Sequence, residues 1–421
     1  SGYDNSSGKL VPFGVIESNV KYPIVSNYGP NWFRILFNDR VGYIHKSTTK
    51  SYEVTNYNYS LNEMINKQMT VSPQTDAYRN KPIWVHSSNL SVSGSTVRLK
   101  GKITGNKVNI RSNANTNSST IDTVNKGTQF VYLGNVTGSP VSGSTTWYKI
   151  NYGGEIGYVH SSLANIRIPY YESPSSSSHL YGTTSFVSTS YRNKSGQWYQ
   201  LNLSITWRNA KRADVEKYVN PDKQDMYQFL VLSESVNLSP ASINRVLQGK
   251  GVLHNKGQAY IDASKKYGVN EIYLISHSLL ETGNGTSQLA KGVEVGKNSN
   301  GTPTLVNSSN RNKLKDIKKV YNMYGIGAND NCALSCGATY AYNHNWTSVN
   351  TAIIEGAAFV SNNYFARGQN TLYKMRWNPA NPGTYQYATD VAWAHKQISR
   401  IKDLYSQLTD PMMTFDIPKY K

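Results

Sequence analysis

The segment ISHSLLETGNGTSQLAKG, from Ile275 to Gly292, holds a single acidic residue, Glu281, at the point where an apolar run ends. The residues before it repeat at helical spacing, which predicts a helix with a buried stripe that begins after Asn270. The apolar members of this stripe are Ile272, Ile275, Leu279 and Leu280. A glycine-rich turn, Thr282-Gly283-Asn284-Gly285, follows Glu281 directly. The sequence therefore predicts a buried helix that ends in a lone carboxylate.

A carboxylate at this position is expected to have a raised pKa. The C-terminus of a helix carries the negative end of its dipole, and apolar neighbours remove water from the charged form. A raised pKa suits a general acid that works near neutral pH. Gly283 and Gly285 would leave room for a substrate chain beside the backbone. The alternative is a solvated glutamate at a helix end with the glycines as a simple C-cap, and the residues alone do not decide between the two.

Composition restricts the class of protein and its partners. A chain of 421 residues is long enough for roughly two to four domains. The net charge of +19 favours a polyanionic partner, either nucleic acid, anionic lipid or an anionic cell wall. No zinc-finger spacing or arginine-rich tract is present, so nucleic acid is disfavoured. The 32 tyrosines are typical of a protein that contacts carbohydrate, or of a β-rich extracellular protein without a sugar ligand.

The sequence shows neither a membrane span nor a signal peptide. No run of 18 apolar residues exists, so no membrane span is expected. The chain starts Ser-Gly-Tyr without a signal-peptide pattern, which reads as a mature product or an excised piece.

An internal repeat lies in the first half of the chain. NWFRILFNDRVGYIHKS, from Asn31 to Ser47, aligns with TWYKINYGGEIGYVHSS, from Thr146 to Ser162. Each copy predicts a strand, a tight turn at Asn38-Asp39 or Gly153-Gly154, and a second strand. A third echo, IWVHSS from Ile83 to Ser88, repeats only the final strand. The positions in register are Trp32 and Trp147, Gly42-Tyr43 and Gly157-Tyr158, and His45 and His160.

The predicted secondary structure changes from mainly strands to mainly helices near Ala210. Before it, YSLNEMINKQM predicts one helix between the repeats, and the serine run after Glu172 predicts a linker or exposed loop. Beyond it, SPASINRVL, GQAYIDASKKYGV, NTAIIEGAAFVSNNYF and ATDVAWAHKQISRIKDLYSQL predict helices. Cys332 and Cys336 have C-x3-C spacing, which is weak as a metal signal. A local disulfide and two free thiols both remain open, and neither a metal nor a cofactor is expected.

Four long motifs in the second half resemble the glucosaminidase catalytic domain of bacterial autolysins, glycoside hydrolase family 73. They are SHSLLETGNGTSQLAKG, MYGIGA, GQNTLYKMRWNPANPGTYQYATD and FDIPKYK, and the likeness covers roughly Ala210 to Lys421. The repeats resemble bacterial Src-homology-3-like wall-binding modules, most clearly in NKVNIRSNANTNSSTIDTVNKGTQFVYLG. In both copies the tryptophan is expected to fill the core of its module.

The resemblance implies small β-barrel modules followed by a mainly α-helical, lysozyme-like (α+β) catalytic domain. The expected parts are a module at 1–48 that reads as incomplete, a connecting segment at 49–100, and a module at 101–166. A Ser-rich linker with strands at 167–209 and the catalytic domain at 210–421 complete the chain.

The family cleaves the glycan strand of peptidoglycan after N-acetylglucosamine. Its catalytic acid corresponds to Glu281 here, and Tyr387 of the YATD motif is expected to line the cleft opposite. Asp390 in the same motif either orients this region or caps the following helix, and the cap is the preferred interpretation. Substrate-binding roles are expected for Tyr324, Asn370, Tyr373, Arg376, Trp377 and Asn378. A buried Trp377 with an ion-paired Arg376 is the alternative, and His277, one turn before Glu281, is expected to be a satisfied core histidine.

A second carboxylate is not obvious, although glycosidases usually use a pair. Glu294, Asp316 and Asp330 follow Glu281, and Glu294 is the candidate if a β-lobe strand turns it toward the cleft. No spacing rule selects among them. The preferred hypothesis is substrate assistance, in which the acetamido oxygen of the sugar attacks its own anomeric carbon.

The sequence thus favours a secreted, cell-wall-associated peptidoglycan hydrolase that acts as a monomer. Its expected partners are peptidoglycan and anionic wall polymers. Two alternatives remain, a muramidase or lytic transglycosylase acting on the same glycan, and a wall-binding adhesin without catalytic activity.

Overall fold

The computed structural model describes residues 1–16, 20–37, 40–77, 79, 81–175, 180–181, 191–194, 197–201, 207–329, 332–409 and 411–421. The predicted turn at Asn38-Asp39, most of the serine-rich linker, and Asp330 therefore lie outside the described residues. The chain forms two compact units. The first unit contains Ser1–Thr70, Lys217–Ala388 and Ala392–Lys421, and the second contains Val71–Glu216 with Thr389–Val391.

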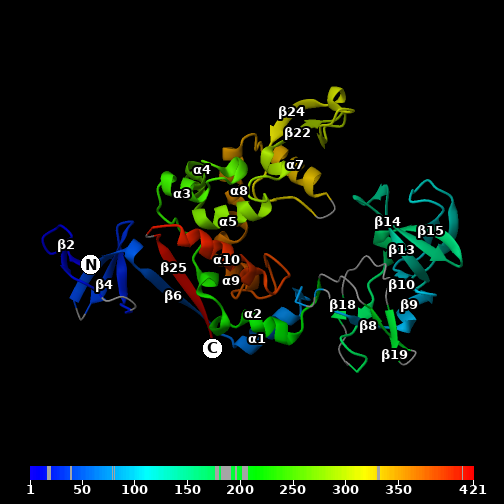
Figure 1. Ribbon diagram of the computed structural model, residues 1–421, viewed down its shortest axis with the longest axis horizontal. Coiled ribbons are helices and arrows are strands. Elements are labelled where there is room, and N and C mark those ends of the chain that lie inside the picture. The colour runs from blue at the N-terminus through cyan, green and yellow to red at the C-terminus, as the bar shows by residue number, and fades with distance from the viewer. Residues whose placement is uncertain are drawn as a thin grey trace. The chain divides into compact units, whose positions relative to one another are not determined.

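The second unit is built from antiparallel sheets. Its largest sheet has the order β12-β11-β15-β14-β13-β10-β16, with β9 paired to β10 (Figure 1). The tryptophan of this module, Trp147, is 2% exposed and donates from Nε1 to the Ser139 carbonyl, so it fills the core as expected. The strands are β9 Leu90–Ser93, β10 Thr96–Ile103, β11 Val108–Arg111, β12 Thr120–Val124, β13 Gln129–Val141, β14 Ser144–Tyr152, β15 Glu155–His160 and β16 Ala164–Asn165.

In both repeats, a strand that carries a tryptophan pairs with a strand that carries a histidine. In the first copy β4 (Trp32–Phe37) pairs Trp32 with His45 of β5 (Arg40–His45), and in the second β14 pairs Trp147 with His160. Each histidine ring lies edge-on to its tryptophan, at 5.0 Å and 5.4 Å between ring centroids. Each also caps a short 3-10 helix through Nδ1, which accepts from the backbone N–H two residues later.

The third echo completes the same arrangement with a strand from far along the chain. β8 (Ile83–His86) pairs with β20 (Trp198–Leu201), and His86 lies opposite Trp198 at 5.2 Å. His86 Nδ1 accepts from the Ser88 N–H, as its counterparts do. His86 and Trp198 therefore form the third Trp–His pair among the described residues. In this pair the strand with the histidine precedes the strand with the tryptophan in the sequence. The module expected at 101–166 is inserted between them.

The remaining strands of the second unit are short. β19 Tyr191–Lys194 extends the β20-β8 pair, β17 Pro169–Tyr170 pairs with β18 Leu180–Tyr181, and β7 Gln74–Thr75 pairs with β21 Arg208–Asn209.

The first unit begins with a five-stranded sheet of order β2-β1-β5-β4-β3. Its β3 has the register of β13, because Ile24 lies opposite Ile35 as Tyr132 lies opposite Ile150. Tyr132 is fully buried, whereas Ile24 is 43% exposed. Tyr132 belongs to the hydrophobic core cluster of its module, where β10 pairs with β13, whereas no described strand pairs with the outer edge of β3. The other strands are β1 Gly2–Asp4, β2 Val11–Gly14 and β3 Ile24–Tyr28.

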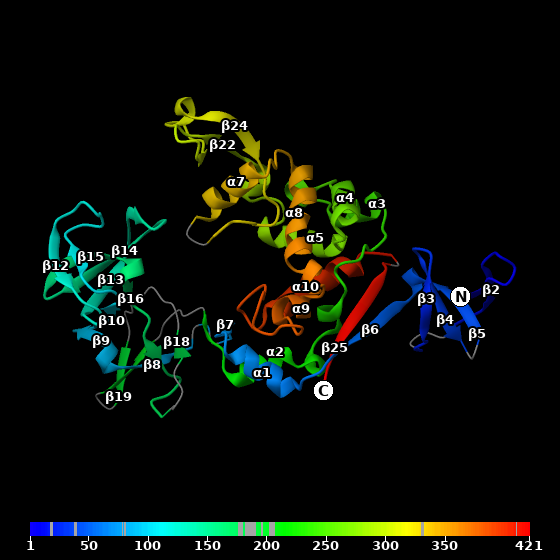
Figure 2. The same cartoon turned by 180° about the vertical axis from the view of Figure 1, so that it is seen from behind.

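Residues 50–70 pack within the first unit. β6 (Lys50–Tyr57) pairs in parallel with β25 (Met413–Tyr420), the blue and red strands that lie side by side in Figure 1 and Figure 2. Stacked rings of Tyr57 and Tyr420 support the pair at 5.6 Å. The helix α1 (Leu61–Met69) follows, with Ser60 and Glu63 in a capping box. Part of the expected connecting segment therefore contributes a strand and a helix to the same unit as the helices.

The helical part of the first unit follows the sequence signals closely. Ser239 caps α3, Gly268 ends α4 in the left-handed conformation at φ 60°, and Asn270 caps α5. A small sheet of order β23-β22-β24 projects from the helices (Figure 1). The elements are α2 Arg212–Val219, α3 Pro240–Val246, α4 Gly257–Tyr267, α5 Glu271–Glu281, α6 Gln288–Lys291, β22 Val293–Lys297, β23 Pro303–Leu305, β24 Lys315–Val320, α7 Ala333–Asn343, α8 Val349–Asn363, α9 Leu372–Trp377 and α10 Trp393–Ser406.

Short 3-10 turns complete the chain at η1 Lys46–Thr48, η2 Ser87–Asn89, η3 Ser161–Leu163, η4 Pro221–Lys223, η5 Met226–Phe229, η6 Gly251–Leu253, η7 Arg311–Lys313 and η8 Phe365–Arg367. None of the helices in the described ranges combines the length and apolar character that a membrane crossing requires. The architecture is therefore multidomain, β-rich in its first half and mainly helical in its second.

Candidate active site

The helix α5 lies at the centre of the helical core and fixes the position of Glu281. Its side chains from Glu271 to Ser276 are all buried, whereas Leu280 is 46% exposed and departs from the expected stripe. Thr282 follows Glu281 as the C-cap, and its hydroxyl accepts from the Gly285 N–H at 2.8 Å. Glu281 is therefore held at the last turn of a rigid, buried helix.

The turn after Glu281 needs glycine for backbone reasons. Gly285 has φ 78°, and a Cβ there would lie 2.3 Å from the Lys250 carbonyl oxygen. A side chain would strain the backbone and collide with that loop. The glycine therefore serves the packing of the turn against the Lys250 loop.

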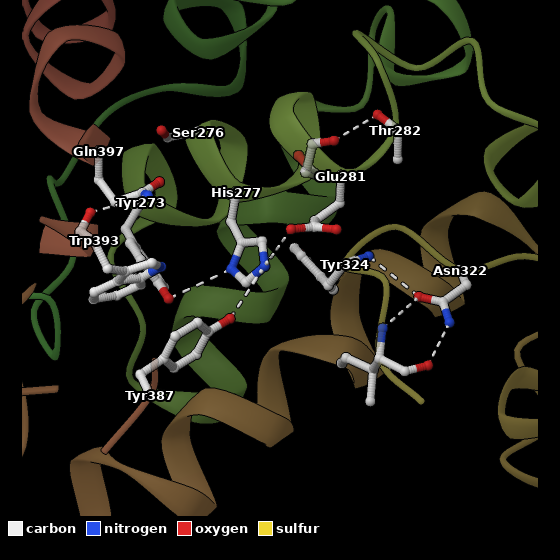
Figure 3. Close-up of polar contacts among 12 residues, drawn as sticks. Tyr273, Ser276, His277, Glu281, Thr282, Asn322, Tyr324, Tyr387, Trp393 and Gln397 are labelled. Carbon is white, nitrogen blue, oxygen red and sulfur yellow. Dashed lines mark hydrogen bonds and ion pairs between the residues drawn. The ribbon is translucent and has the colours of Figure 1, made fainter. Parts of the chain in front are cut away.

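A cavity of about 520 Å³ opens beside Glu281. Four of its lining side chains carry polar groups that the sequence had singled out, His277, Glu281, Tyr324 and Tyr387 (Figure 3). A second space of about 30 Å³, roughly enough for one water molecule, is also lined by His277, Glu281 and Tyr387. Glu281 is the only carboxylate among the described residues that line either space.

Burial raises the pKa of Glu281, as expected from its apolar surroundings, although the charge of Arg400 acts in the opposite direction. The side chain remains 38% exposed, so the carboxyl reaches the cavity. His277 Nε2 lies 3.7 Å from its Oε1. Burial lowers the pKa of His277 to about 4, so the imidazole next to Glu281 is neutral near pH 7. His277 therefore does not act as a cationic partner of the Glu281 carboxyl near pH 7.

Tyr387 reaches the cavity from the loop after α9. Its backbone N–H donates to the Met375 carbonyl at 3.0 Å, and its ring stacks on Trp393 at 4.5 Å between centroids. Its hydroxyl lies 3.4 Å from His277 Nε2. Burial is the main cause that raises the pKa of Tyr387, so the phenol stays neutral.

Residues 324–329 line a further part of the cavity, and two residues of this loop region, Asn322 and Gly325, were not among the predicted site residues. The Asn322 carboxamide is 1% exposed and accepts from the N–H groups of Tyr324 and Ile326, which holds the turn closed (Figure 3). Gly325 has φ 63°, and a Cβ at this position would lie only 2.6 Å from Glu281 Oε2. The glycine in MYGIGA was the available signal, because only glycine leaves space for the carboxyl.

The residues of TLYKMRWN do not line the cavity. Tyr373, Arg376 and Trp377 are all 0% exposed, and Asn378 is 5% exposed. The Arg376 guanidinium lies 4.0 Å from the Trp377 ring centroid and donates to Gln386 at 3.3 Å. Arg376 and Asn378 bond to Gln386 and Thr384 of the Tyr387 loop, which corrects the expectation that these residues bind sugar. Buried side chains offer no surface to a substrate in this conformation.

The other expected binding residues differ in position. Tyr324 lines the cavity, and its hydroxyl donates to the Ile353 carbonyl at 2.9 Å. Asn370 lies outside the cavity lining and donates to Ser233 Oγ at 3.1 Å. Asp390 is buried and forms a parallel bridge with Gln74, and the N-cap of α10 is Ala392. Helix α10 therefore begins at Trp393, and the role of Asp390 as a cap stays a prediction.

The candidates for a second acid are engaged elsewhere. Glu294 lies on β22 as expected, but it forms a double hydrogen bond with Arg311 at 2.6 Å and 3.0 Å and does not line the cavity. Arg311 holds the pKa of Glu294 below its usual value, which disfavours a role as an acid. Asp316 is exposed and pairs with Lys297 at 3.9 Å. Cys332 and Cys336 form a disulfide, which resolves the alternative that the sequence left open.

Comparison with known proteins agrees with this division of the chain. The glucosaminidase family, described as mannosyl-glycoprotein endo-beta-N-acetylglucosaminidase, matches residues 257–406, and the bacterial SH3 domain family matches residues 106–165. The bifunctional autolysin of Staphylococcus epidermidis is 48% identical over 225 residues, which cover 52% of this chain and 16% of the relative. The beta-N-acetylglucosaminidase of Bacillus subtilis (strain 168) is 36% identical over 377 residues, 87% of this chain and 32% of the relative.

Among solved structures, a crystal structure of a major bifunctional autolysin is 46% identical, with a TM-score of 0.41, and the match covers 51% of this chain and 84% of that one. The chain spans less than a third of the length of the curated relatives described above. By these matches the chain carries a bacterial SH3 domain at residues 106–165, followed by a glucosaminidase domain of glycoside hydrolase family 73 at residues 257–406.

Proposed function

We propose that this protein is a peptidoglycan hydrolase that cleaves the glycan strand after N-acetylglucosamine, with Glu281 as the catalytic acid. The observation that carries the proposal is the cavity of about 520 Å³, in which Glu281 is the single carboxylate among the described lining residues. Burial raises the pKa of that carboxyl, which keeps a transferable proton available closer to neutral pH. The family match and the names of the relatives support the same reaction class.

The arrangement favours a substrate-assisted mechanism. Glu281 would protonate the glycosidic oxygen while the acetamido oxygen of N-acetylglucosamine attacks the anomeric carbon. An oxazolinium ion forms as the bond to the leaving sugar breaks. Water then attacks the anomeric carbon as the C1–O bond of the oxazolinium ion breaks, Glu281 takes a proton from this water, and the configuration is retained. Tyr387 supplies a neutral hydroxyl beside Glu281 that can orient the acetamido group.

The same proposal includes the architecture. We place a lysozyme-like catalytic domain at 210–421 and β-barrel-like wall-binding modules at 1–48 and 101–166, joined by segments 49–100 and 167–209. Strand β6 at Lys50–Tyr57 adds to the catalytic domain by pairing with β25. The match of residues 106–165 to the bacterial SH3 family supports the second module.

Anionic wall polymers are the proposed second partner. Residues 291–320, which include the β22-β23-β24 sheet, carry seven lysines and arginines and only two carboxylates. Lys297 and Lys315 lie directly opposite each other across β22 and β24, and Asp316 balances only one of these two charges, so the sheet keeps a net positive charge that can attract an anionic polymer. Lys297→Gln with Lys315→Gln should weaken binding to walls at low salt and reduce its salt dependence. Unchanged binding would argue against this surface.

The protein is proposed to act outside the cell, associated with the wall, as a monomer. The match to the bacterial SH3 family and the autolysin names of its relatives support this location.

The reaction is tested by mass spectrometry of fragments from purified peptidoglycan. N-acetylglucosamine is expected at the new reducing ends, with retained anomeric configuration in a fresh proton spectrum. Reducing ends of N-acetylmuramic acid would identify a muramidase, and anhydro ends a lytic transglycosylase. Wall binding without any cleavage would identify an adhesin.

A further inference from the structure

His277 contacts both proposed active-site groups, although the reaction as described gives it no role. It lies one turn before Glu281 on α5 and is 15% exposed. Its ring packs edge-on against Tyr324 at 5.7 Å and against Tyr387 at 6.2 Å between centroids. We propose that His277 is a positioning residue whose tautomer directs the hydroxyl hydrogen of Tyr387 into the cavity. The inference rests on the proposed function only in assigning a reaction to that cavity.

Both ring nitrogens of His277 have a phenol within hydrogen-bond reach. Nδ1 lies 3.4 Å from the Tyr273 hydroxyl, and Nε2 lies 3.4 Å from the Tyr387 hydroxyl (Figure 3). A neutral imidazole donates from one nitrogen and accepts at the other. The tautomer therefore decides which phenol donates to the ring and which accepts from it.

Tyr273 decides between the two tautomers. Its side chain is 4% exposed and lines the smaller space of about 30 Å³ but not the larger cavity. Nδ1 of His277 is the hydrogen-bond partner of its hydroxyl among the described residues. A buried O–H without an acceptor is costly, so Tyr273 donates to Nδ1 and the ring proton resides on Nε2.

Nε2–H then faces two oxygens at the cavity, the Tyr387 hydroxyl and Glu281 Oε1. Because the Tyr387 oxygen accepts from Nε2, its own hydrogen is free to point into the cavity. The opposite tautomer would turn that hydrogen back onto Nε2 and leave only lone pairs for a ligand. Tyr273, His277 and Tyr387 thus form a chain that presents a phenol donor beside the acid.

A direct test reads the proton positions by ¹⁵N NMR of the histidine side chains in the full chain at pH 7. The signals of His277 are assigned by comparison with His277→Gln. The expected result is a protonated Nε2 and an unprotonated Nδ1 in the free protein. Tyr273→Phe keeps the ring but removes the donor, and it should reduce this preference. A proton on Nδ1 in the unmutated protein would overturn the proposal.

A kinetic cycle tests whether His277 acts through Tyr387. His277→Leu and Tyr387→Phe should each lower kcat at least tenfold with little change in KM, and the double variant should be no slower than Tyr387→Phe. His277→Gln, which keeps an N–H donor near Nε2, should recover most of kcat and covers the case in which His277→Leu fails to fold. Losses that multiply in the double variant would overturn the proposal.

The proposed function and the proposed role of His277 can be disproved independently. An active Glu281→Gln variant contradicts the proposed function whatever the tautomer of His277. An inactive Glu281→Gln together with multiplying losses contradicts only the role of His277.

Discussion

Gly325→Ala tests whether the position of the Glu281 carboxyl controls turnover. The added Cβ would lie 2.6 Å from Glu281 Oε2. Because an ordinary contact between such atoms is about 3.5 Å, the carboxyl must move by roughly 0.9 Å. The colliding atom is the end of a flexible side chain, so the carboxyl rather than the loop should give way.

We expect Gly325→Ala to lower activity strongly and stability only slightly. A misplacement of about 1 Å can lower a rate by about 10²-fold, so we expect kcat to fall by roughly 10- to 100-fold. The left-handed backbone at φ 63° adds about 1–2 kcal/mol for alanine. For a domain of this size each kcal/mol lowers Tm by about 2–4 °C.

The assay is release of reducing ends from purified peptidoglycan, with Tm measured on the same samples. Gly283→Ala is the matched control. It has a similar φ of 55°, and its nearest neighbour is Thr286 Oγ1 at 3.6 Å, so it adds backbone strain without touching the carboxyl. If Gly325→Ala loses no more activity than Gly283→Ala, the position of the Glu281 carboxyl does not limit turnover and the reasoning is refuted.

Three further predictions concern the acid, the disulfide and His277. Glu281→Gln should lower kcat by about 10²–10⁴-fold because the transferable proton is lost, whereas Glu294→Gln should leave activity unchanged; equal losses would restore a pair of acids. Cys332→Ser with Cys336→Ser should lower stability by about 2 kcal/mol through loop-closure entropy, and an unchanged Tm would contradict this. His277 has a folded pKa of about 4 against 6.5 unfolded. As pH falls, the unfolded state therefore binds the proton before the folded state does, and the free energy of unfolding should drop by about 3 kcal/mol between pH 6.5 and pH 4. His277→Gln should remove this part of the pH dependence, which urea unfolding measures.

Local patterns predicted the helices well. Ser239, Gly268 and Asn270 were identified as caps, and each lies at the end of the helix that its pattern indicated. Such signals involve residues within a turn of each other, so tertiary packing does not alter them. The lone carboxylate at the end of a buried helix was predicted for the same reason.

Burial of polar motifs was predicted poorly. Arg376 and Trp377 have the residue types of a sugar-binding surface, yet both are fully buried behind the Tyr387 loop. Asn322 carries no chemical signature of a site, and Gly325 carries only the glycine of MYGIGA, yet together they shape the loop beside the Glu281 carboxyl. Composition describes what a side chain can bind, whereas the packing of neighbouring elements decides whether it is exposed.

The sequence by itself determined the helices, their caps, the Trp–His repeats and the place of Glu281 on its helix, because each is encoded by short-range spacing. Only the tertiary structure decided that β6 pairs with β25 and that Trp198 lies opposite His86. It also decided that Tyr273, His277 and Tyr387 form one chain of contacts beside Glu281. These contacts join residues that are distant in sequence or that face one another only once the loop carrying Tyr387 is docked. No local spacing marks such partners, so the core has to assemble before they are defined.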